Sequence, residues 1–245
     1  MKIYFAGADA DIERLKVLGV KYILIAYPYF KRKGFNKKFL GDFNLFLDSG
    51  AYSVFTGVAQ VDLKEMIEDY KKLDFISLKC GLDVIGNAEE TKQNCLKMRE
   101  AGLDVVPTFH YGESFEYLKF YCDNFNYVAL GGVAQLRSQS SLLIRWLDNC
   151  YSIIRDYVPK IKVHGFAITS YKLLLRYPFY SVDSTTWQSA ARFAEHNELK
   201  GFKLKRIKSK HLPRDSRLKK NVKSILDLEK FVTNVWKSRG IIWSN

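Results

Sequence analysis

The sequence has few of the residues that hold metals or disulfides. Its four cysteines, Cys80, Cys95, Cys122 and Cys150, stand singly, and no CxxC or CxC pair occurs. This spacing indicates neither a zinc ribbon nor a disulfide framework, and reduced cysteines in a cytoplasmic protein are the default. We therefore expect no structural metal and no disulfide.

Long apolar runs are also missing. No stretch approaches the roughly 18 residues that a membrane-spanning helix needs. The first residues, Met1 to Phe5, resemble a strand rather than a signal peptide. No internal repeat or low-complexity segment is present. We expect a soluble, cytoplasmic protein that does not contact a membrane.

Acidic residues are scarce relative to basic ones. The chain has 39 Lys and Arg against 26 Asp and Glu, which gives a net charge of +13 and a pI near 9.4. Such a charge favours a polyanionic partner, most simply a nucleic acid. The length of 245 residues and the hydrophobic content of 47% fit one large α/β domain.

Apolar strand-like runs alternate with amphipathic stretches, the pattern of repeated βα units. Eight such strands with helices between them predict a (β/α)8 TIM barrel, although an open doubly wound sheet has the same periodicity. The expected strands cover residues 2–6, 22–27, 43–48, 75–84, 104–110, 127–130, 162–168 and 180–183. The expected helices cover residues 9–18, 62–73, 88–101, 115–122, 142–157 and 171–177, and another begins near Trp187.

The composition changes after the barrel. Residues 200–223 contain eleven Lys or Arg and one acid, Asp215. Such a run is either a solvated connector or a phosphate-binding strip, and its density favours the strip. Ser224 is expected to cap a last helix that runs to Arg239. We expect residues 1–199 to form the barrel and 200–245 to pack on it within a single domain. The expected phosphate-binding residues are Lys203, Lys205, Arg206, Lys208, Lys210, Arg214 and Arg217, with the basic loop 31–38 (including Lys37) as a second clamp.

Four predicted strands end in functional groups: Asp48, Asp83, His110 and Asp183. Barrel enzymes keep their chemistry at the carboxyl ends of their strands. Asp183 alone would be explained as a turn or cap residue, and Thr185 or Thr186 can also cap the helix that follows. A packing explanation would have to account for all four groups together.

The strand ends also resemble a known family. Asp48–Tyr52, Leu82–Asp83, Leu130–Ala134 and Asp183 come in the order and rough spacing of the tRNA-guanine transglycosylase superfamily, over residues 45–190 or so. This resemblance implies a barrel enzyme that needs no cofactor. It would exchange guanine in a polynucleotide for a free 7-deazaguanine base through a covalent glycosyl-enzyme intermediate.

The resemblance also implies roles for single residues. Asp183 would be the nucleophile on the sugar C1′, and Asp48 the general acid and base. Tyr52 would stack on the base, Asp83 would hold the guanine edge, and Gly131 with Gly132 would supply backbone donors or a close approach. The remaining substrate-binding candidates are Ser49, Gly50, His110 and Phe166.

The chemistry of guanine exchange agrees with these roles. Guanine presents N1–H and N2–H2 donors side by side, so one carboxylate such as Asp83 can accept both. An anomeric carbon that loses a base develops oxocarbenium character, and a carboxylate nucleophile divides the exchange into two similar steps. A second carboxylate can protonate the departing base and deprotonate the incoming one.

The sequence also departs from the tRNA enzymes. Those enzymes normally carry a CxCxxC…H zinc site after the barrel, and this chain has none. Ala51 replaces a motif glycine, and Phe109–Glu113 replaces a Gln-containing segment. His110 therefore either contacts the substrate in a different way or is a satisfied histidine at the barrel rim.

These departures resemble the short branch of DNA-modifying transglycosylases of phages and genomic islands, which insert bases such as preQ0 into DNA. We expect DNA as the polymer, with tRNA as the alternative. The target guanosine would have to be flipped out or unpaired to reach a barrel mouth. The aromatic residues expected to stack on it are Tyr52, Phe109, Tyr111 and Phe166.

Two other functions stay open. A metal-dependent hydrolase could use His110, His164 and Asp183, but the HxH pair expected on an early strand is missing and only four His occur. A non-catalytic nucleic-acid-binding barrel would explain the charge. It would not explain strand-end carboxylates that converge on one mouth, where their repulsion destabilises the fold.

Overall fold

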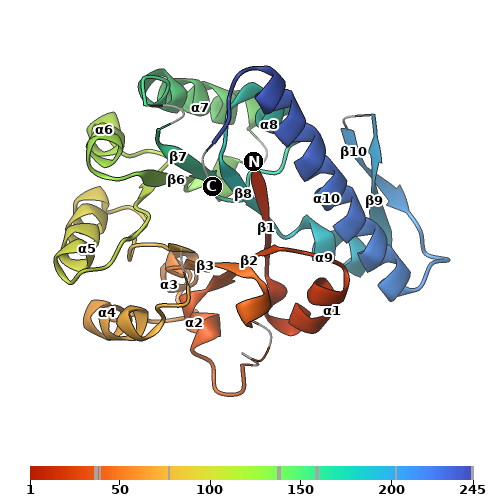
Figure 1. Ribbon diagram of the computed structural model, residues 1–245, viewed down its shortest axis with the longest axis horizontal. Coiled ribbons are helices and arrows are strands. Elements are labelled where there is room, and N and C mark those ends of the chain that lie inside the picture. Colours follow the sequence, from red (N-terminus) through yellow and green to blue (C-terminus); the bar gives the residue numbers. More distant parts are fainter. Residues whose placement is uncertain are drawn as a thin grey trace.

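The protein forms a barrel of eight parallel strands in the order β4-β3-β2-β1-β8-β7-β6-β5 (Figure 1). The computed structural model describes residues 1–35, 38, 40–76, 78–136, 139–157, 160–201 and 203–243, so Lys37 of the first basic loop lies outside the described residues. The barrel strands are β1 (Lys2–Ala6), β2 (Tyr22–Ala26), β3 (Asn44–Asp48), β4 (Leu78–Lys79), β5 (Thr108–His110), β6 (Tyr127–Gly131), β7 (Lys162–Gly165) and β8 (Ser181–Ser184).

The barrel closes between β4 and β5 through few backbone hydrogen bonds. Cys80 and Val106 form an isolated parallel bridge, and the Gly81 N–H donates to the Val106 carbonyl at 3.0 Å. The strands predicted over 75–84 and 104–110 are therefore too long. Pro107 explains part of the difference, because it has no N–H with which to continue the ladder before Thr108.

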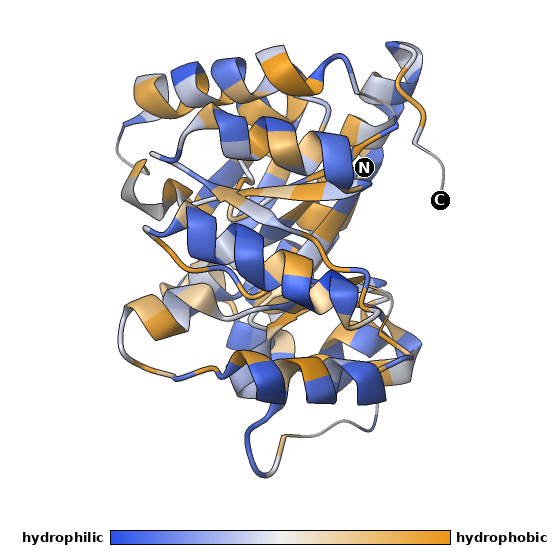
Figure 2. Cartoon of the chain, turned by 90° about the vertical axis from the view of Figure 1, so that its left-hand side faces the viewer, coloured by the Kyte–Doolittle hydropathy of each residue, from blue (hydrophilic) through white to orange (hydrophobic). Residues whose placement is uncertain are grey.

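Helices cover the outside of the barrel. Figure 2 shows hydrophilic and hydrophobic residues interspersed along the helices of one side, as expected for helices that bury a single face. The predicted helix over 9–18 is divided in two, with Asp11 between a short 3₁₀ turn and α1. The helices are η1 (Ala8–Ala10), α1 (Ile12–Val17), α2 (Tyr27–Phe30), η2 (Leu40–Asp42), α3 (Ala51–Phe55), α4 (Leu63–Lys72), α5 (Ala88–Glu100), α6 (Phe115–Asn124), η3 (Val133–Leu136), α7 (Ser140–Ile154), α8 (Tyr171–Arg176) and α9 (Thr186–Arg192).

Two hydrophobic layers hold these elements together. Inside the barrel, the rings of Tyr4, Phe46 and Tyr127 fill the lumen with smaller residues from the other strands. A larger layer lies between strands and helices, and it includes the fully buried Trp187. All four cysteines are buried and free. Within the described part of the chain, no helix combines the length and apolarity that crossing a bilayer requires.

The C-terminal region differs from its prediction. The strands β9 (Glu195–Lys200) and β10 (Lys203–Lys208) pair antiparallel at the edge of the molecule (Figure 1). The last helix, α10 (Arg214–Ser238), begins at Arg214 and not at Ser224. The boundary expected between residues 199 and 200 falls inside β9.

The early start of α10 has a simple cause. Leu218, Val222 and Ile225 are buried at a spacing of four and three residues, so they form one apolar stripe while the basic residues occupy the other faces. Ser224 lies inside the helix, and its hydroxyl donates to the Asn197 carbonyl of β9 at 2.7 Å. The helix packs on β1, α8 and α9.

Candidate functional site

A cavity of about 590 Å³ opens at the carboxyl ends of the barrel strands. It brings together residues that are far apart in the sequence, because every strand of a parallel barrel points its carboxyl end to the same side. Its floor and walls include the predicted site residues Asp48, Tyr52, Asp83, His110, Gly131, Gly132, Phe166 and Asp183.

Asp183 is held from two sides at the end of β8. Its Oδ1 accepts the Ala167 N–H at 2.6 Å, and His164 Nε2 lies 3.5 Å from the same oxygen. Ala167 has a φ of 55°, a left-handed conformation that is uncommon for a residue other than glycine. The backbone after β7 therefore turns sharply at the point where its N–H meets the carboxylate. This turn also ends β7 at Gly165, before the predicted residue 168.

His164 lies beneath this carboxylate and is fully buried. Burial lowers the pKa of His164 and outweighs the attraction of Asp183, so the ring is neutral near pH 7. Its Nδ1 lies 2.5 Å from Ser181 Oγ, which in turn lies 2.5 Å from the Tyr127 hydroxyl. A chain of polar groups in the lumen thus fixes the orientation of the imidazole.

Asp48 differs from Asp183 in its electrostatics. Burial, together with the charges of Asp83 and Asp183, raises the pKa of Asp48 to about 7. The Gly50 N–H donates to its Oδ2 at 3.3 Å and partly opposes this shift. Near neutral pH the Asp48 carboxyl therefore exists both with and without its proton, which is the property that a general acid and base requires.

Asp83 belongs to a chain of four side chains. Its Oδ2 lies 2.8 Å from His110 Nε2, and its Oδ1 accepts a hydrogen bond from the Ser49 hydroxyl. His110 Nδ1 lies 3.1 Å from Glu113 Oε1, and Glu113 Oε2 accepts the His110 N–H at 2.9 Å. Burial alone would lower the pKa of His110, but the hydrogen bonds and charges of Asp83 and Glu113 raise it to about 9. His110 is thus a cation between two carboxylates.

These hydrogen bonds bear on the two roles expected for His110, which were contact with the substrate or a satisfied histidine at the barrel rim. Both ring nitrogens are engaged by carboxylates, so His110 reaches a ligand in the cavity mainly through Asp83. Ser49 is fully buried behind Asp83 and does not line the cavity. Its predicted contact with substrate is therefore replaced by a contact with Asp83.

The glycines of the site have packing roles. A Cβ on Gly131 would lie 2.9 Å from a Thr108 methyl group, and one on Gly132 would lie 2.9 Å from the Tyr111 backbone nitrogen. Gly132 also has a φ of 72°. Gly131 and Gly132 therefore pack closely against the end of β5, and both glycines line the cavity wall. Gly50 lies outside the cavity lining, and Pro28 fills the space where its side chain would be.

Two of the expected stacking aromatics do not face the cavity. Phe109 is fully buried against Phe115 and Trp146, on the helix side of β5. Tyr111 packs edge-on against the same tryptophan. Residues alternate between the two faces of a strand, so Phe109 must point outward when Thr108 and His110 point into the barrel. Tyr52 and Phe166 do line the cavity, and Tyr52 is 64% exposed.

Sequence reasoning missed three contributors to the site. Tyr29 lines the cavity from α2, Ala167 holds Asp183, and Glu113 holds His110. Tyr29 was within reach of the sequence, because it follows the end of β2 by three residues. Ala167 was not, since its role depends on a backbone N–H. Thr185 occupies the N-cap position of α9, as expected, but its side chain makes no capping hydrogen bond, and Ser184 Oγ accepts the Thr186 N–H at 3.1 Å.

The predicted phosphate-binding residues separate into two groups. Lys203, Lys205 and Lys208 of β10 are exposed, as are Arg206, Lys210 and Arg214. Arg217 is different, because its guanidinium donates to the carbonyls of Ala191, at 3.2 and 3.3 Å, and of Leu212. Arg217 thus ties α10 to the end of α9, and its prediction as a phosphate contact was wrong.

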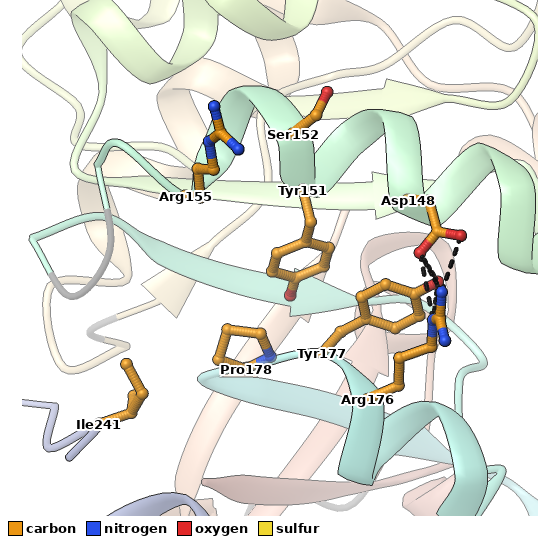
Figure 3. Close-up of a pocket in the computed structure, with 8 residues that line it drawn as sticks. All are labelled: Asp148, Tyr151, Ser152, Arg155, Arg176, Tyr177, Pro178 and Ile241. Carbon is orange, nitrogen blue, oxygen red and sulfur yellow. Dashed lines mark hydrogen bonds and ion pairs between the residues drawn. The ribbon is translucent and has the colours of Figure 1, made fainter. Parts of the chain in front are cut away.

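A second cavity, of about 650 Å³, lies between α7 and α8 (Figure 3). Tyr151 and Tyr177 stack there with ring centroids 5.0 Å apart, and Arg176 pairs with Asp148 at 2.8 Å. Pro178 lies just before β8 begins, so this cavity is at the amino ends of the strands. It is remote from Asp48, Asp83 and Asp183. In a TIM barrel the residues at this end contribute to stability.

The geometry does not join His110, His164 and Asp183 into one set of metal ligands. His110 is bound by Asp83 and Glu113, whereas His164 lies beneath Asp183 with its Nδ1 on Ser181. Over the described ranges, no group of three or more His, Cys, Asp or Glu is arranged to hold a metal ion.

Known structures share the barrel. A structure described as native KDPGal has a TM-score of 0.52 over 95% of both chains at 8% identity. A mutant tryptophan synthase α-subunit from the hyperthermophile Pyrococcus furiosus has a TM-score of 0.53 at 13% identity, over 92% of this chain and 96% of that one. The fold is a TIM barrel. Identities this low establish the fold alone.

Sequence comparison adds one relative. The chain is 27% identical over 183 residues to uncharacterized protein 306 of Sulfolobus islandicus rod-shaped virus 1. The match covers 71% of this chain and 58% of the viral protein. No family model matches the sequence.

Proposed function

We propose that this protein is a base-exchange transglycosylase that replaces guanine in a nucleic acid, DNA in the first place, with a 7-deazaguanine base. The observation that carries the proposal is the division of labour among three carboxylates in one cavity. Asp183 is held in place by a backbone N–H, Asp48 has a pKa raised to about 7 by burial and by its two neighbours, and Asp83 is paired with a cationic imidazole.

The first half-reaction uses Asp183 and Asp48. A carboxylate oxygen of Asp183 attacks the sugar C1′, the C1′–N9 bond breaks, and its electron pair stays on the guanine. Asp48 in its protonated form gives the departing guanine a proton. Because Ala167 and His164 engage Oδ1, the other oxygen of Asp183 is the one left for the new bond.

The second half-reaction reverses these steps. The 7-deazaguanine enters the place of guanine, loses its N9 proton to Asp48, and forms the new bond to C1′ as Asp183 leaves. No water, redox group or cofactor enters the balance. The raised pKa of Asp48 supports both roles, since one carboxyl must give and take a proton at the same pH.

Asp83 is the group that selects the base in this scheme. Each carboxylate oxygen has two lone-pair directions, so Asp83 can accept guanine N1–H and N2–H while it keeps Ser49 and His110. A 7-deazaguanine has the same edge and is accepted in the same way. The exposed Tyr52 and the cavity-lining Phe166, which is backed by the buried ring of Phe46, supply flat surfaces for the ring.

The positive surface charge supports the proposal that the exchanged guanine is part of a polynucleotide. Lys203, Lys205 and Lys208 lie exposed on one hairpin, and none of the ion pairs found among the described residues involves these three lysines. They are therefore available to phosphates. The target guanosine must be flipped out or unpaired, because a duplex cannot reach the floor of the cavity.

The test is exchange of radiolabelled guanine or preQ0 into DNA and tRNA at one salt concentration, with Asp183→Asn as the control. The proposal expects label in DNA with the wild-type protein and none with the variant. Label in tRNA alone would replace DNA as the polymer and leave the carboxylate roles in place. Label in neither polymer would overturn the transglycosylase proposal.

A further inference from the structure

A side cavity of about 350 Å³ adjoins the carboxylate cavity on the side of β1 and β2. The two cavities share three residues, Leu24, Ala26 and Tyr29, so they meet across a common wall. The outer wall of the side cavity is α9, the helix that follows β8. A polymer bound in the carboxylate cavity would therefore reach the side cavity by passing over the Tyr29 side chain.

One cation is fixed on the α9 wall. Arg192 Nη2 donates to Gln188 Oε1 at 3.0 Å, and Gln188 Nε2 donates in turn to the Gly7 carbonyl at 2.8 Å and to Asp11 Oδ2 at 3.2 Å. Gln188 is 8% exposed, so it is a fixed support. Among the ion pairs of the described residues, none involves Arg192. Its charge is thus positioned at the cavity and available to an anion.

A second cation, Arg32, stacks on Tyr29 in the wall that the two cavities share. The Arg32 guanidinium lies 4.4 Å from the centroid of the Tyr29 ring. This stacking restrains the ring and places another positive charge at the edge of the mouth. The acid that lines the side cavity, Asp9, is exposed and lies in η1, shortly after β1. It is an acceptor for the amino or imino groups of a base.

The position of α9 relates this cavity to the reacting sugar. Asp183 lies in β8, and α9 begins three residues later at Thr186 and ends at Arg192. A sugar bonded to Asp183 in a polynucleotide carries a phosphate on either side. A phosphate on the β1 side of this sugar would lie toward the start of α9, the helix whose last residue, Arg192, lines the side cavity.

The same helix links the cavity to the basic hairpin. Arg206 Nη2 of β10 donates to Ser189 Oγ of α9 at 3.3 Å. Figure 1 shows α9 between the barrel and the β9–β10 hairpin. A strand that leaves the side cavity across α9 therefore comes to Lys203, Lys205 and the other cations of that hairpin.

We propose that the side cavity is a subsite for the nucleotide next to the exchanged guanosine in the polymer strand. Arg192 binds the phosphate between the two nucleotides, and the neighbouring nucleoside lies against Tyr29 with Asp9 as an acceptor for its base. The proposal rests on the proposed function and adds to it a place where sequence context is read.

The first experiment measures exchange kinetics for Arg192→Gln and Arg192→Lys. Arg192→Gln should raise KM for the oligonucleotide roughly tenfold or more, as the loss of a charge-assisted contact does, and leave KM for the free base unchanged. Arg192→Lys should restore part of the loss. The matched control is Arg155→Gln, which removes one exposed charge at the opposite end of the barrel. An equal rise in KM for the control, or no rise for Arg192→Gln, would overturn the subsite.

The second experiment needs no exchange activity. Calorimetric titration of the wild-type protein with the 5′-phosphorylated dinucleotide of guanosine should give binding that Arg192→Gln weakens and Arg155→Gln does not. If the wild-type protein binds in this way but exchanges no base, the transglycosylase proposal fails and the subsite stands. If both variants bind as the wild-type protein does, the subsite is refuted even where exchange is found.

Discussion

His110 Nε2 lies 2.8 Å from Asp83 Oδ2 in the wall of the cavity, and both side chains are more than nine-tenths buried. A buried carboxylate is stable only when it is paired and hydrogen-bonded. Here the imidazole is the partner, and Glu113 on its other nitrogen keeps it charged. Glu113, which does not line the cavity, therefore acts on Asp83 through His110.

Glu113→Gln tests this relationship. The variant removes one of the two charges that raise the pKa of His110, so the pKa falls from about 9 toward the ordinary value. A raised histidine pKa stabilises the fold fully below about pH 6.5, and this stabilisation is lost as pH rises through about 9, so the variant should lose most stability near pH 6 and progressively less toward pH 9. Thermal unfolding across this range measures it, and the ¹⁵N shifts of His110 report its charge directly. An unchanged His110 titration would contradict the account.

Asp48 should oppose folding as pH rises. Its pKa is raised from 3.8 to about 7, so the folded state holds more protons than the unfolded state between these values. Stability therefore decreases across this window, by at most about 4 kcal/mol. Asp48→Asn should remove this decrease, and it should be more stable than the wild-type protein at pH 8 but not at pH 4. Urea unfolding at both pH values gives the comparison, and equal pH dependence in the two proteins would refute it.

Gly50→Ala should destabilise the loop that follows Asp48. A Cβ there would lie 2.4 Å from Pro28 Cδ, and the φ of 83° is itself unfavourable for alanine. We expect a loss of roughly 2–4 kcal/mol. Gly57 has a similar φ of 72° with nothing within 4 Å, so Gly57→Ala should lose only about 1–2 kcal/mol. Denaturant unfolding measures both, and equal losses would mean that the contact with Pro28 has no effect.

Lys205→Gln should change the salt dependence of DNA binding. Each phosphate contact contributes about 0.7–0.9 to the slope of log K against log salt, and loss of one exposed lysine should reduce the slope by that amount. Arg217→Gln should instead lower stability and leave the slope unchanged, because Arg217 binds carbonyls of the protein. Fluorescence anisotropy over a series of salt concentrations distinguishes the two. A slope unaffected by Lys205→Gln would remove the hairpin from the interface.

The sequence predicted the barrel well because buried parallel strands are continuous apolar runs with helices between them. The ends of these runs also placed Asp48, Asp83, His110 and Asp183 in one mouth. The predicted start of the last helix at Ser224 was wrong, because the dense positive charge of residues 214–223 obscured its apolar stripe. Leu218 and Val222 of this stripe are buried and lie among lysines and arginines.

Other features of the site have no signal in the sequence. Phe109 was expected at the mouth because it is near a strand end, and only the register of β5 shows that it points outward. Ala167 acts through its backbone, and Arg192 becomes relevant only because α9 lies against the loop after β1. Such contacts depend on how separate elements pack.

The proposed function depends most directly on a covalent intermediate at Asp183. The protein would be incubated with a guanosine-containing oligonucleotide, denatured and digested, and the peptide that bears the sugar identified by mass spectrometry. We expect an oligonucleotide adduct on Asp183 that has lost one guanine, that a 7-deazaguanine base releases, and that Asp183→Asn does not form. An adduct on another residue, or guanine exchange that persists in Asp183→Asn at more than a few per cent of the wild-type rate, would contradict it.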